Sequence, residues 1–199
     1  MNDQNGPFRK KVEHFDQPGD AHFLTFSCYR RLPLLLERQA PERFVAALGR
    51  ARDKHDFDLW AWVIMPEHVH LLIRPRRPEY SIASMLADIK RGVGMEMLAD
   101  FRKTNPSLLA RLFVREGRRL RQRFWQAGPG TDRNVFEPAT ALRIMEYIHN
   151  NPVLRGLVAA ALDWQWSSAR AWAGWSDVVL SVDRTLPILG QFPGWEKSS

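Results

Sequence analysis

A chain of 199 residues can bury one sizeable core, and its apolar fraction of 45% argues against disorder away from the ends. With 29 Lys and Arg against 22 Asp and Glu, the net charge is +7, which predicts an anionic partner, nucleic acid first. No apolar run reaches the roughly 18 residues of a membrane span, the N-terminus lacks a signal-peptide layout, and a single cysteine, Cys28, excludes an internal disulfide. We therefore expect a cytoplasmic protein outside the membrane.

The first half of the chain predicts three strands and one helix. Residues 1–20 are polar and contain Gly and Pro, which is typical of a flexible arm. Aromatic and β-favouring residues indicate strands, while apolar residues at steps of three and four indicate a helix. These elements are expected at 22–29 (strand), 41–55 (helix), 57–65 (strand) and 69–73 (strand), the last two forming a hairpin.

The second half predicts two more helices and one more strand. We expect them at 82–101 (helix), 123–126 (strand at the far edge of the sheet) and 140–151 (helix). Pro152 disfavours helix in the residue before it, so the third helix is expected to end or restart there. Residues 21–170 are taken as one domain, and 171–199 as a C-terminal extension packed on it or trailing it.

The order β-α-β-β-α-β followed by an extra helix predicts an α+β fold. An antiparallel sheet would carry both crossover helices on one face. The opposite face of the sheet would then be free to form a site.

His68 and His70 lie two residues apart, His70 in the third predicted strand and His68 directly before it in the same extended run. Because side chains alternate along a strand, both imidazoles share one face, while Val69, Leu71 and Ile73 share the other. Two imidazoles on one face can share a divalent metal ion. The spacing is equally typical of a hydrogen-bonded pair at a strand edge, so both interpretations stay open.

Tyr147 and Asn151 lie four residues apart in the third predicted helix, and so on one face of it. A phenol beside an amide oxygen resembles a nucleophile beside a metal ligand, since a nearby cation favours the ionised phenol. Alternatively, Tyr147 is a core tyrosine and Asn151 caps a helix beginning at Pro152. His149 falls on roughly the opposite side of the helix and is not included as a ligand.

Two stretches resemble a known family. Trp62-Val-Ile-Met-Pro-Glu-His-Val-His-Leu-Leu-Ile73 is similar to the histidine–hydrophobic–histidine (HUH) motif of single-tyrosine transposases of the insertion-sequence family. Tyr147-Ile-His-Asn-Asn-Pro-Val-Leu-Arg-Gly-Leu-Val158 is similar to the catalytic-tyrosine helix of the branch associated with repetitive extragenic palindromes. Shorter similarities, in the same order along the chain, extend the resemblance over residues 22–170.

The resemblance implies a ferredoxin-like fold whose added C-terminal helix carries the tyrosine. It implies a metal-dependent transposase that cleaves and rejoins single-stranded DNA near hairpins through a 5′-phosphotyrosine intermediate. By motif position Tyr147 is the nucleophile, and His68, His70 and Asn151 bind Mg²⁺ or Mn²⁺. One departure is Leu154, which stands where a basic residue is common, so that one DNA contact is expected to be missing.

A basic stretch between Arg111 and Arg123 predicts where the DNA lies. It holds six arginines against one acid, Glu116, and the guanidinium fork suits phosphates and stacks on bases. The candidate DNA-binding residues are Arg115, Arg118, Arg119, Arg121 and Trp125. Trp125 is a weaker candidate than the arginines, because packing in the core is the more usual role for such a residue.

Three other functions are weighed against the transposase. The first is a domesticated, non-catalytic hairpin-DNA-binding protein, which has no need to keep the whole His-His-Tyr-Asn set. The second is a replication-initiator or relaxase-like nickase, which would give nicked rather than joined products. The third is a zinc hydrolase, for which no further ligand has a suggestive spacing. A monomer is favoured over a homodimer.

Overall fold

The structure is a computed structural model that describes residues 16–128 and 130–186. Its main elements, in chain order, are β1 (Ala21–Ser27), α1 (Ala40–His55), β2 (Phe57–Ile64), β3 (His68–Pro75), α2 (Ile82–Thr104), α3 (Pro106–Arg111), β4 (Phe113–Glu116), β5 (Arg119–Gln122), β6 (Thr131–Val135), α4 (Pro138–Leu154) and α5 (Ala169–Trp172). Single 3₁₀ turns lie at Tyr29–Arg31, Leu34–Leu36 and Ala161–Asp163.

Four strands form one antiparallel sheet in the order β2-β3-β1-β6, as expected for the α+β fold. The strand expected at 123–126 is wrong. Phe124 and Trp125 are buried aromatic residues of the core, and they make only an isolated bridge between Trp125 and Cys28. The outer strand beside β1 is β6, whose sequence Thr-Asp-Arg-Asn-Val is polar because it lies at the edge and is mostly solvent-facing.

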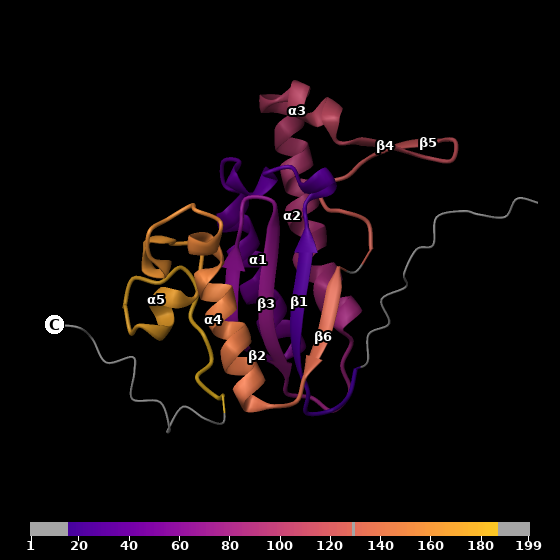
Figure 1. Cartoon of the computed structure of the whole chain (residues 1–199). Helices are drawn as coiled ribbons and strands as arrows, with labels where there is room; N and C mark the ends of the chain where they lie inside the picture. The colour runs from indigo at the N-terminus through magenta and orange to yellow at the C-terminus, as the bar shows by residue number, and fades with distance from the viewer. Residues whose placement is uncertain (1–15, 129, 187–199) are drawn as a thin grey trace, which may run out of the picture.

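Helices cover both faces of the sheet (Figure 1). On one face, α1 and α2 pack on a core that includes Val69, Leu71 and Ile73, as the alternation in β3 predicts. On the other face, α4 packs with Ile144 and Ile148 over β2, and leaves the neighbouring part of β3 and β1 to form a site. The expected free face is therefore covered in part.

The helix α4 runs without a break through Pro152, so the expected end at Asn151 is wrong. Proline lacks an N–H, so one helical hydrogen bond is missing at this point, and the helix ends two residues later at Leu154. Asn151 lies inside the helix, where its backbone oxygen accepts from the N–H of Arg155, and is not an N-cap. Tyr147 and Asn151 consequently belong to one rigid element.

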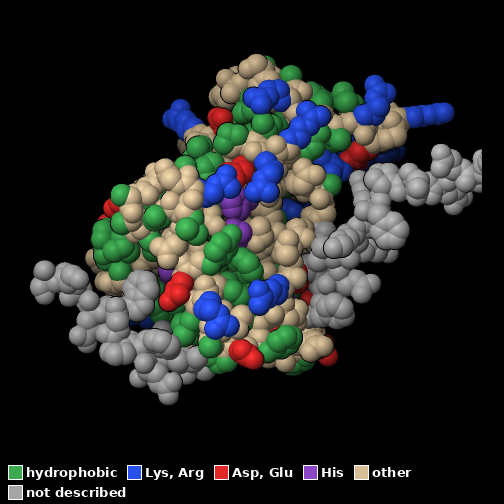
Figure 2. Space-filling model, viewed as in Figure 1, with side chains coloured by type: hydrophobic (Ala, Val, Ile, Leu, Met, Phe, Trp, Pro, Cys, Tyr) green, Lys and Arg blue, Asp and Glu red, His purple; other side chains and the backbone are tan. Residues whose placement is uncertain are grey.

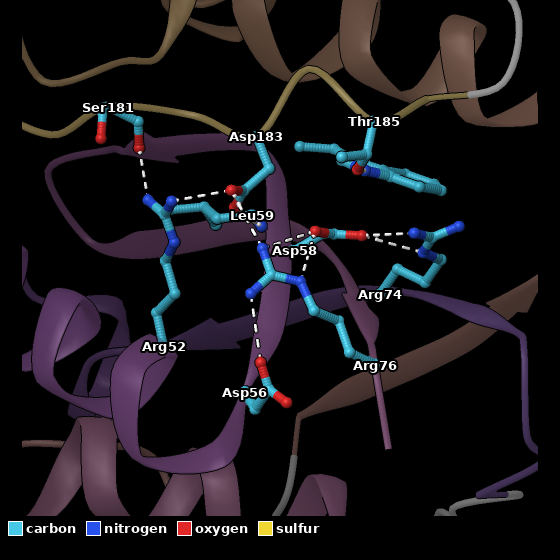
Figure 3. A network of polar contacts seen from close by, with 10 residues as sticks. Arg52, Asp56, Asp58, Leu59, Arg74, Arg76, Ser181, Asp183 and Thr185 are labelled. Atoms are coloured by element: carbon cyan, nitrogen blue, oxygen red, sulfur yellow. Dashed lines mark hydrogen bonds and ion pairs between the residues drawn. The ribbon is translucent and has the colours of Figure 1, made fainter. Parts of the chain in front are cut away.

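The outer edge of β2 is covered by the segment that follows α4. The backbone N–H groups of Ser168 and Asp183 donate to the carbonyl oxygens of Trp62 and Leu59, at 3.0 Å each. Figure 3 shows the Asp183 carboxylate between Arg52 and Arg76, from which it accepts at 2.8 and 3.1 Å. Residues up to 186 of the expected C-terminal extension thus pack on the domain, while 187–199 and residues 1–15 of the expected arm lie outside the described residues.

The strands β4 and β5 form a separate two-stranded ribbon that projects from the body of the molecule (Figure 1). No helix in the described part of the chain is long and apolar enough to cross a membrane.

Candidate active site

The imidazoles of His68 and His70 point at a common position on the α4 side of the sheet. Their Nε2 atoms are 3.1 Å apart, and the two residues are only 4% and 5% exposed. Two ligands about 2.1 Å from one ion and at right angles to each other would lie about 3 Å apart. The pair is thus spaced as two neighbouring ligands of one ion would be, and also as two neutral imidazoles joined by a hydrogen bond, so both interpretations from the sequence fit this distance.

The outward nitrogen of each imidazole has its own partner. The Nδ1–H of His68 donates to Glu67 Oε1 at 3.1 Å, and His70 Nδ1 lies 2.7 Å from Thr25 Oγ1, on the strand paired with β3. Such contacts fix the orientation of a ligating imidazole and leave its other nitrogen for the ion. Thr25 and Glu67 are therefore supporting residues that the spacing of the histidines does not reveal.

Burial keeps both imidazoles neutral. Desolvation, with smaller contributions from His68 and Arg31, lowers the pKa of His70 to about 3. Desolvation also lowers the pKa of His68, although the neighbouring Glu67 opposes the shift. Since a metal ion binds the neutral imidazole, both side chains are in the binding form at pH 7.

Tyr147 stands over this pair. Its ring meets that of His70 edge-on, with centroids 5.4 Å apart, and Phe23 packs against both. The side chain comes from α4, the imidazoles from β3, and the residue is still 44% exposed. The structure thus brings together the tyrosine and the histidines that the sequence singled out, at a position that a large substrate can reach.

Asn151, one turn further along α4, is 5% exposed, and its Oδ1 atom has no hydrogen-bond partner among the described residues. A buried carbonyl oxygen without a partner is costly unless a ligand completes it. Two neutral imidazoles and a free amide oxygen therefore fit a divalent cation. No cluster of three or more His, Cys, Asp or Glu side chains suited to a metal occurs within 16–128 and 130–186.

A family model described as IS200-like transposase matches residues 19–151, which is most of the chain. The chain belongs to the IS200-like transposase family. A REP-associated tyrosine transposase of Haemophilus influenzae is 26% identical to it over 150 residues, covering 75% of this chain and 80% of that protein.

Two solved structures were also found to be similar to this IS200-like transposase. One is a REP-associated tyrosine transposase bound to a REP hairpin, with a TM-score of 0.59 at 19% identity over 92% of this chain and 96% of that one. The two proteins share a fold. A transposase structure from Deinococcus radiodurans matches with a TM-score of 0.42 at 18% identity, over 73% of this chain and 97% of the other.

The remaining predicted site residues of the transposase lie apart from this centre. Arg115, Arg118, Arg119 and Arg121 are exposed on the projecting ribbon β4–β5. Trp125 is 9% exposed and packs among core aromatic rings, and its indole N–H donates to the Lys90 carbonyl oxygen at 2.8 Å. Little of this ring is open to a stacking base, and it contributes to the core; a DNA contact by Trp125 stays a prediction.

His149, on the other side of α4, is 2% exposed, and its Nε2 lies 2.8 Å from Ser168 Oγ. Burial lowers its pKa to about 4, so it is a neutral core histidine at pH 7. Its position agrees with leaving it out of the ligand set.

Proposed function

We propose that this IS200-like transposase is a DNA strand transferase that cleaves and rejoins single-stranded DNA near hairpins, with Tyr147 as the nucleophile. The observation that carries the proposal is the exposed Tyr147 ring against His70, beside two converging imidazole nitrogens. A REP-associated relative by sequence, and another by fold that is bound to a REP hairpin, support a hairpin-bearing strand as the substrate.

In the proposed reaction the Tyr147 oxygen forms a bond to a backbone phosphorus, and the bond from phosphorus to the 3′ oxygen breaks. The phenol gives up its proton to solvent, the leaving oxygen takes one up as a 3′-hydroxyl, and a 5′-phosphotyrosine remains. Attack by a 3′-hydroxyl on this linkage reverses the bond changes and joins strands. One phosphodiester is exchanged for another at each step, so no ATP is needed.

His68, His70 and Asn151 would hold the divalent ion, and Mg²⁺ or Mn²⁺ suits an amide oxygen with open positions for phosphate oxygens. When bound, such an ion polarises the scissile phosphate and stabilises the charge that develops on it. Thr25 and Glu67 keep the imidazoles aimed at it, and the site's burial keeps them unprotonated.

The ribbon β4–β5 is the proposed DNA-binding element. Directly opposed residues share a face, so Arg119 and Arg121 lie on one face of the ribbon, Arg115 lies on the other, and Arg118 lies in the turn. A two-stranded ribbon that packs against the body of its own chain needs one apolar face. The ribbon β4–β5 instead carries arginine side chains on both of its faces. The groove of a duplex stem has phosphates on both walls and admits a two-stranded ribbon.

A monomer is also proposed. Strands at a sheet edge are where a second copy adds most readily. The β2 edge is already occupied by Ser168 and Asp183, and the β6 edge is a strand of 5 mostly polar residues. Sedimentation equilibrium at increasing concentration is expected to give a single species of 23.1 kDa.

The function is tested with a labelled single strand carrying a hairpin, incubated with protein and Mn²⁺ or Mg²⁺ and run on a denaturing gel. The expected result is a covalent protein–DNA band that Tyr147→Phe abolishes. Tyr80→Phe, which removes a hydroxyl from elsewhere, should keep the band. Equal adduct with wild type and Tyr147→Phe would refute the assignment of the nucleophile. Tight hairpin binding without any cleavage would instead favour the non-catalytic binding protein.

A further inference from the structure

Two arginines from distant parts of the chain converge on one buried carboxylate next to His68. Arg155 Nη2 lies 3.2 Å and Arg31 Nη2 3.7 Å from the same oxygen of Glu67, whose side chain is 10% exposed. Arg155 follows the end of α4, while Arg31 lies in the 3₁₀ turn after β1. Figure 2 shows Lys and Arg side chains gathered on this face beside the histidines.

The carboxylate does not neutralise the pair. Glu67 carries one negative charge and also accepts from His68, whereas the two guanidiniums carry two positive charges. The side chains of Arg31 and Arg155 are 65% and 54% exposed, so most of their donors remain available. A surplus of positive charge therefore stands at the opening of a site whose own imidazoles are neutral.

The backbone that carries Arg31 is strained. Arg30 and Arg31 have φ angles of 55° and 52°, a left-handed conformation that costs non-glycine residues about 1 kcal/mol or more each. The turn is held to the loop before β3, because the N–H of Cys28 donates to the Glu67 carbonyl oxygen at 2.8 Å and that of Leu35 to the Pro66 oxygen at 3.0 Å. These two hydrogen bonds fix the turn that carries Arg31 relative to Glu67, and so keep the Arg31 side chain near the site.

We propose that Arg31 and Arg155 form a clamp for one DNA backbone phosphate, either the scissile one or its direct neighbour. The clamp rests on the proposed function, since it presumes that a DNA strand passes this site. Guanidinium groups bind phosphate through paired, charge-assisted hydrogen bonds, and two of them on separate elements would fix the strand in position. When no DNA strand is bound, the Glu67 carboxylate keeps the guanidinium groups of Arg31 and Arg155 close to each other.

The test measures DNA binding without chemistry. In the Tyr147→Phe protein, with EDTA present, fluorescence anisotropy gives the affinity for a hairpin-bearing single strand. Arg155→Ala and Arg31→Gly are compared with Arg77→Ala, an exposed arginine beyond the far end of β3. Glycine is chosen because it suits the left-handed backbone, so the Arg31 variant removes the guanidinium without adding strain.

Each clamp variant is expected to bind about tenfold more weakly, and Arg77→Ala nearly normally. The deciding substrates carry one uncharged methylphosphonate, at the scissile phosphate or at either neighbour. At one of these positions the weakening caused by Arg155→Ala and Arg31→Gly should disappear, because the charge that they contact is already gone. Undiminished weakening at all three positions, or weakening no larger than that of Arg77→Ala, would overturn the clamp.

This outcome is separable from that of the proposed function. The binding assay has neither metal nor nucleophile, so a failed clamp leaves the Tyr147 adduct untouched. If the protein forms no adduct, no scissile phosphate is defined, and the methylphosphonate is instead placed at each phosphate of the single strand beside the hairpin in turn. The clamp then still predicts one position at which the weakening disappears.

Discussion

Tyr147 lies edge-on to His70, with ring planes at 65° to each other. The two residues are far apart in the sequence, since Tyr147 belongs to α4 and His70 to β3. Phe23 stacks on the same imidazole at 5.4 Å. The imidazole is thus held by rings on two sides and by Thr25 at its Nδ1 atom. Of these three neighbours, the Thr25 hydroxyl can be removed without disturbing the rings.

Thr25→Val removes the hydroxyl that contacts His70 Nδ1 and keeps the shape of the side chain. We expect the affinity for Mn²⁺ to fall about tenfold to a hundredfold, as is usual when the partner of a ligating imidazole is removed. Titration calorimetry measures the affinity. Thr131→Val, at an exposed position on the paired strand, is the matched control and should bind Mn²⁺ normally. If both variants bind alike, the Thr25 hydroxyl has no part in holding the ion.

Asn151→Leu replaces the buried amide with an apolar side chain of similar size. In EDTA its unfolding free energy should fall by no more than about 1 kcal/mol, because the Oδ1 atom has no partner to lose among the described residues. With Mn²⁺, the wild type should gain stability that the variant does not. Thermal unfolding with and without the ion tests both expectations. A variant that Mn²⁺ stabilises as much as wild type would exclude Asn151 as a ligand.

Asp58→Asn removes the charge from a fully buried carboxylate that accepts from Arg74 at 2.6 Å and Arg76 at 2.8 Å. Burial alone would raise the pKa of Asp58, but hydrogen bonds from Arg76, Thr185 and Arg74 together lower it. Because its pKa is lower in the folded state, the stability that it contributes is present above about pH 4 and is lost as the pH falls further.

At pH 7 the variant should therefore be less stable by about 3 kcal/mol, since two guanidiniums are left without their buried partner. Urea unfolding at pH 7 and pH 3 should show this gap narrowing at the lower pH. Asp88→Asn, which breaks partly exposed pairs with Lys54 and His55, is the control and should change stability by less than about 1 kcal/mol at either pH. A gap that stays constant with pH would contradict the buried ion pair as the cause.

Replacing Arg118, Arg119 and Arg121 by Gln should reduce the salt dependence of DNA binding. Removing one phosphate contact lowers the slope of log affinity against log salt by about 1, so the slope of the triple variant should be smaller by about 3. Arg50→Gln, at an exposed position on α1, should leave the slope unchanged. An unchanged slope in the triple variant would mean that the ribbon does not touch the DNA backbone.

Much of the fold could be predicted because it follows from local periodicity. The alternation through Val69, Leu71 and Ile73 identified the strand and both of its faces, and helical spacing identified α1 and α2. The outer strand could not be found in this way. Residues 131–135 form the outer strand but are polar and mostly exposed. Phe124 and Trp125 have the composition of a strand, but their side chains are buried in the core.

Residue spacing alone could relate site residues only within one element, and it was the family resemblance that implied the meeting of Tyr147 with the two histidines. Helical spacing put Tyr147 and Asn151 on one face, but the contacts of Thr25 and Arg31 depend on strand pairing and on a left-handed turn. Leu154 led to the expectation of a missing basic contact. Its side chain is 69% exposed, and the next residue, Arg155, is the one that reaches the site, because the helix ends between them.

If Tyr147 and Asn151 act as proposed, the unbroken course of α4 through Pro152 couples the position of the nucleophile to that of an ion ligand. Tyr147 and Asn151 are set in one rod, which is anchored to the sheet by Ile144 and Ile148. A DNA end linked to Tyr147 could therefore be carried beyond the reach of the side chain only if the helix moved with it. That movement would withdraw the amide oxygen together with the tyrosine, so carrying the DNA end away and loosening the grip on the ion would be a single event.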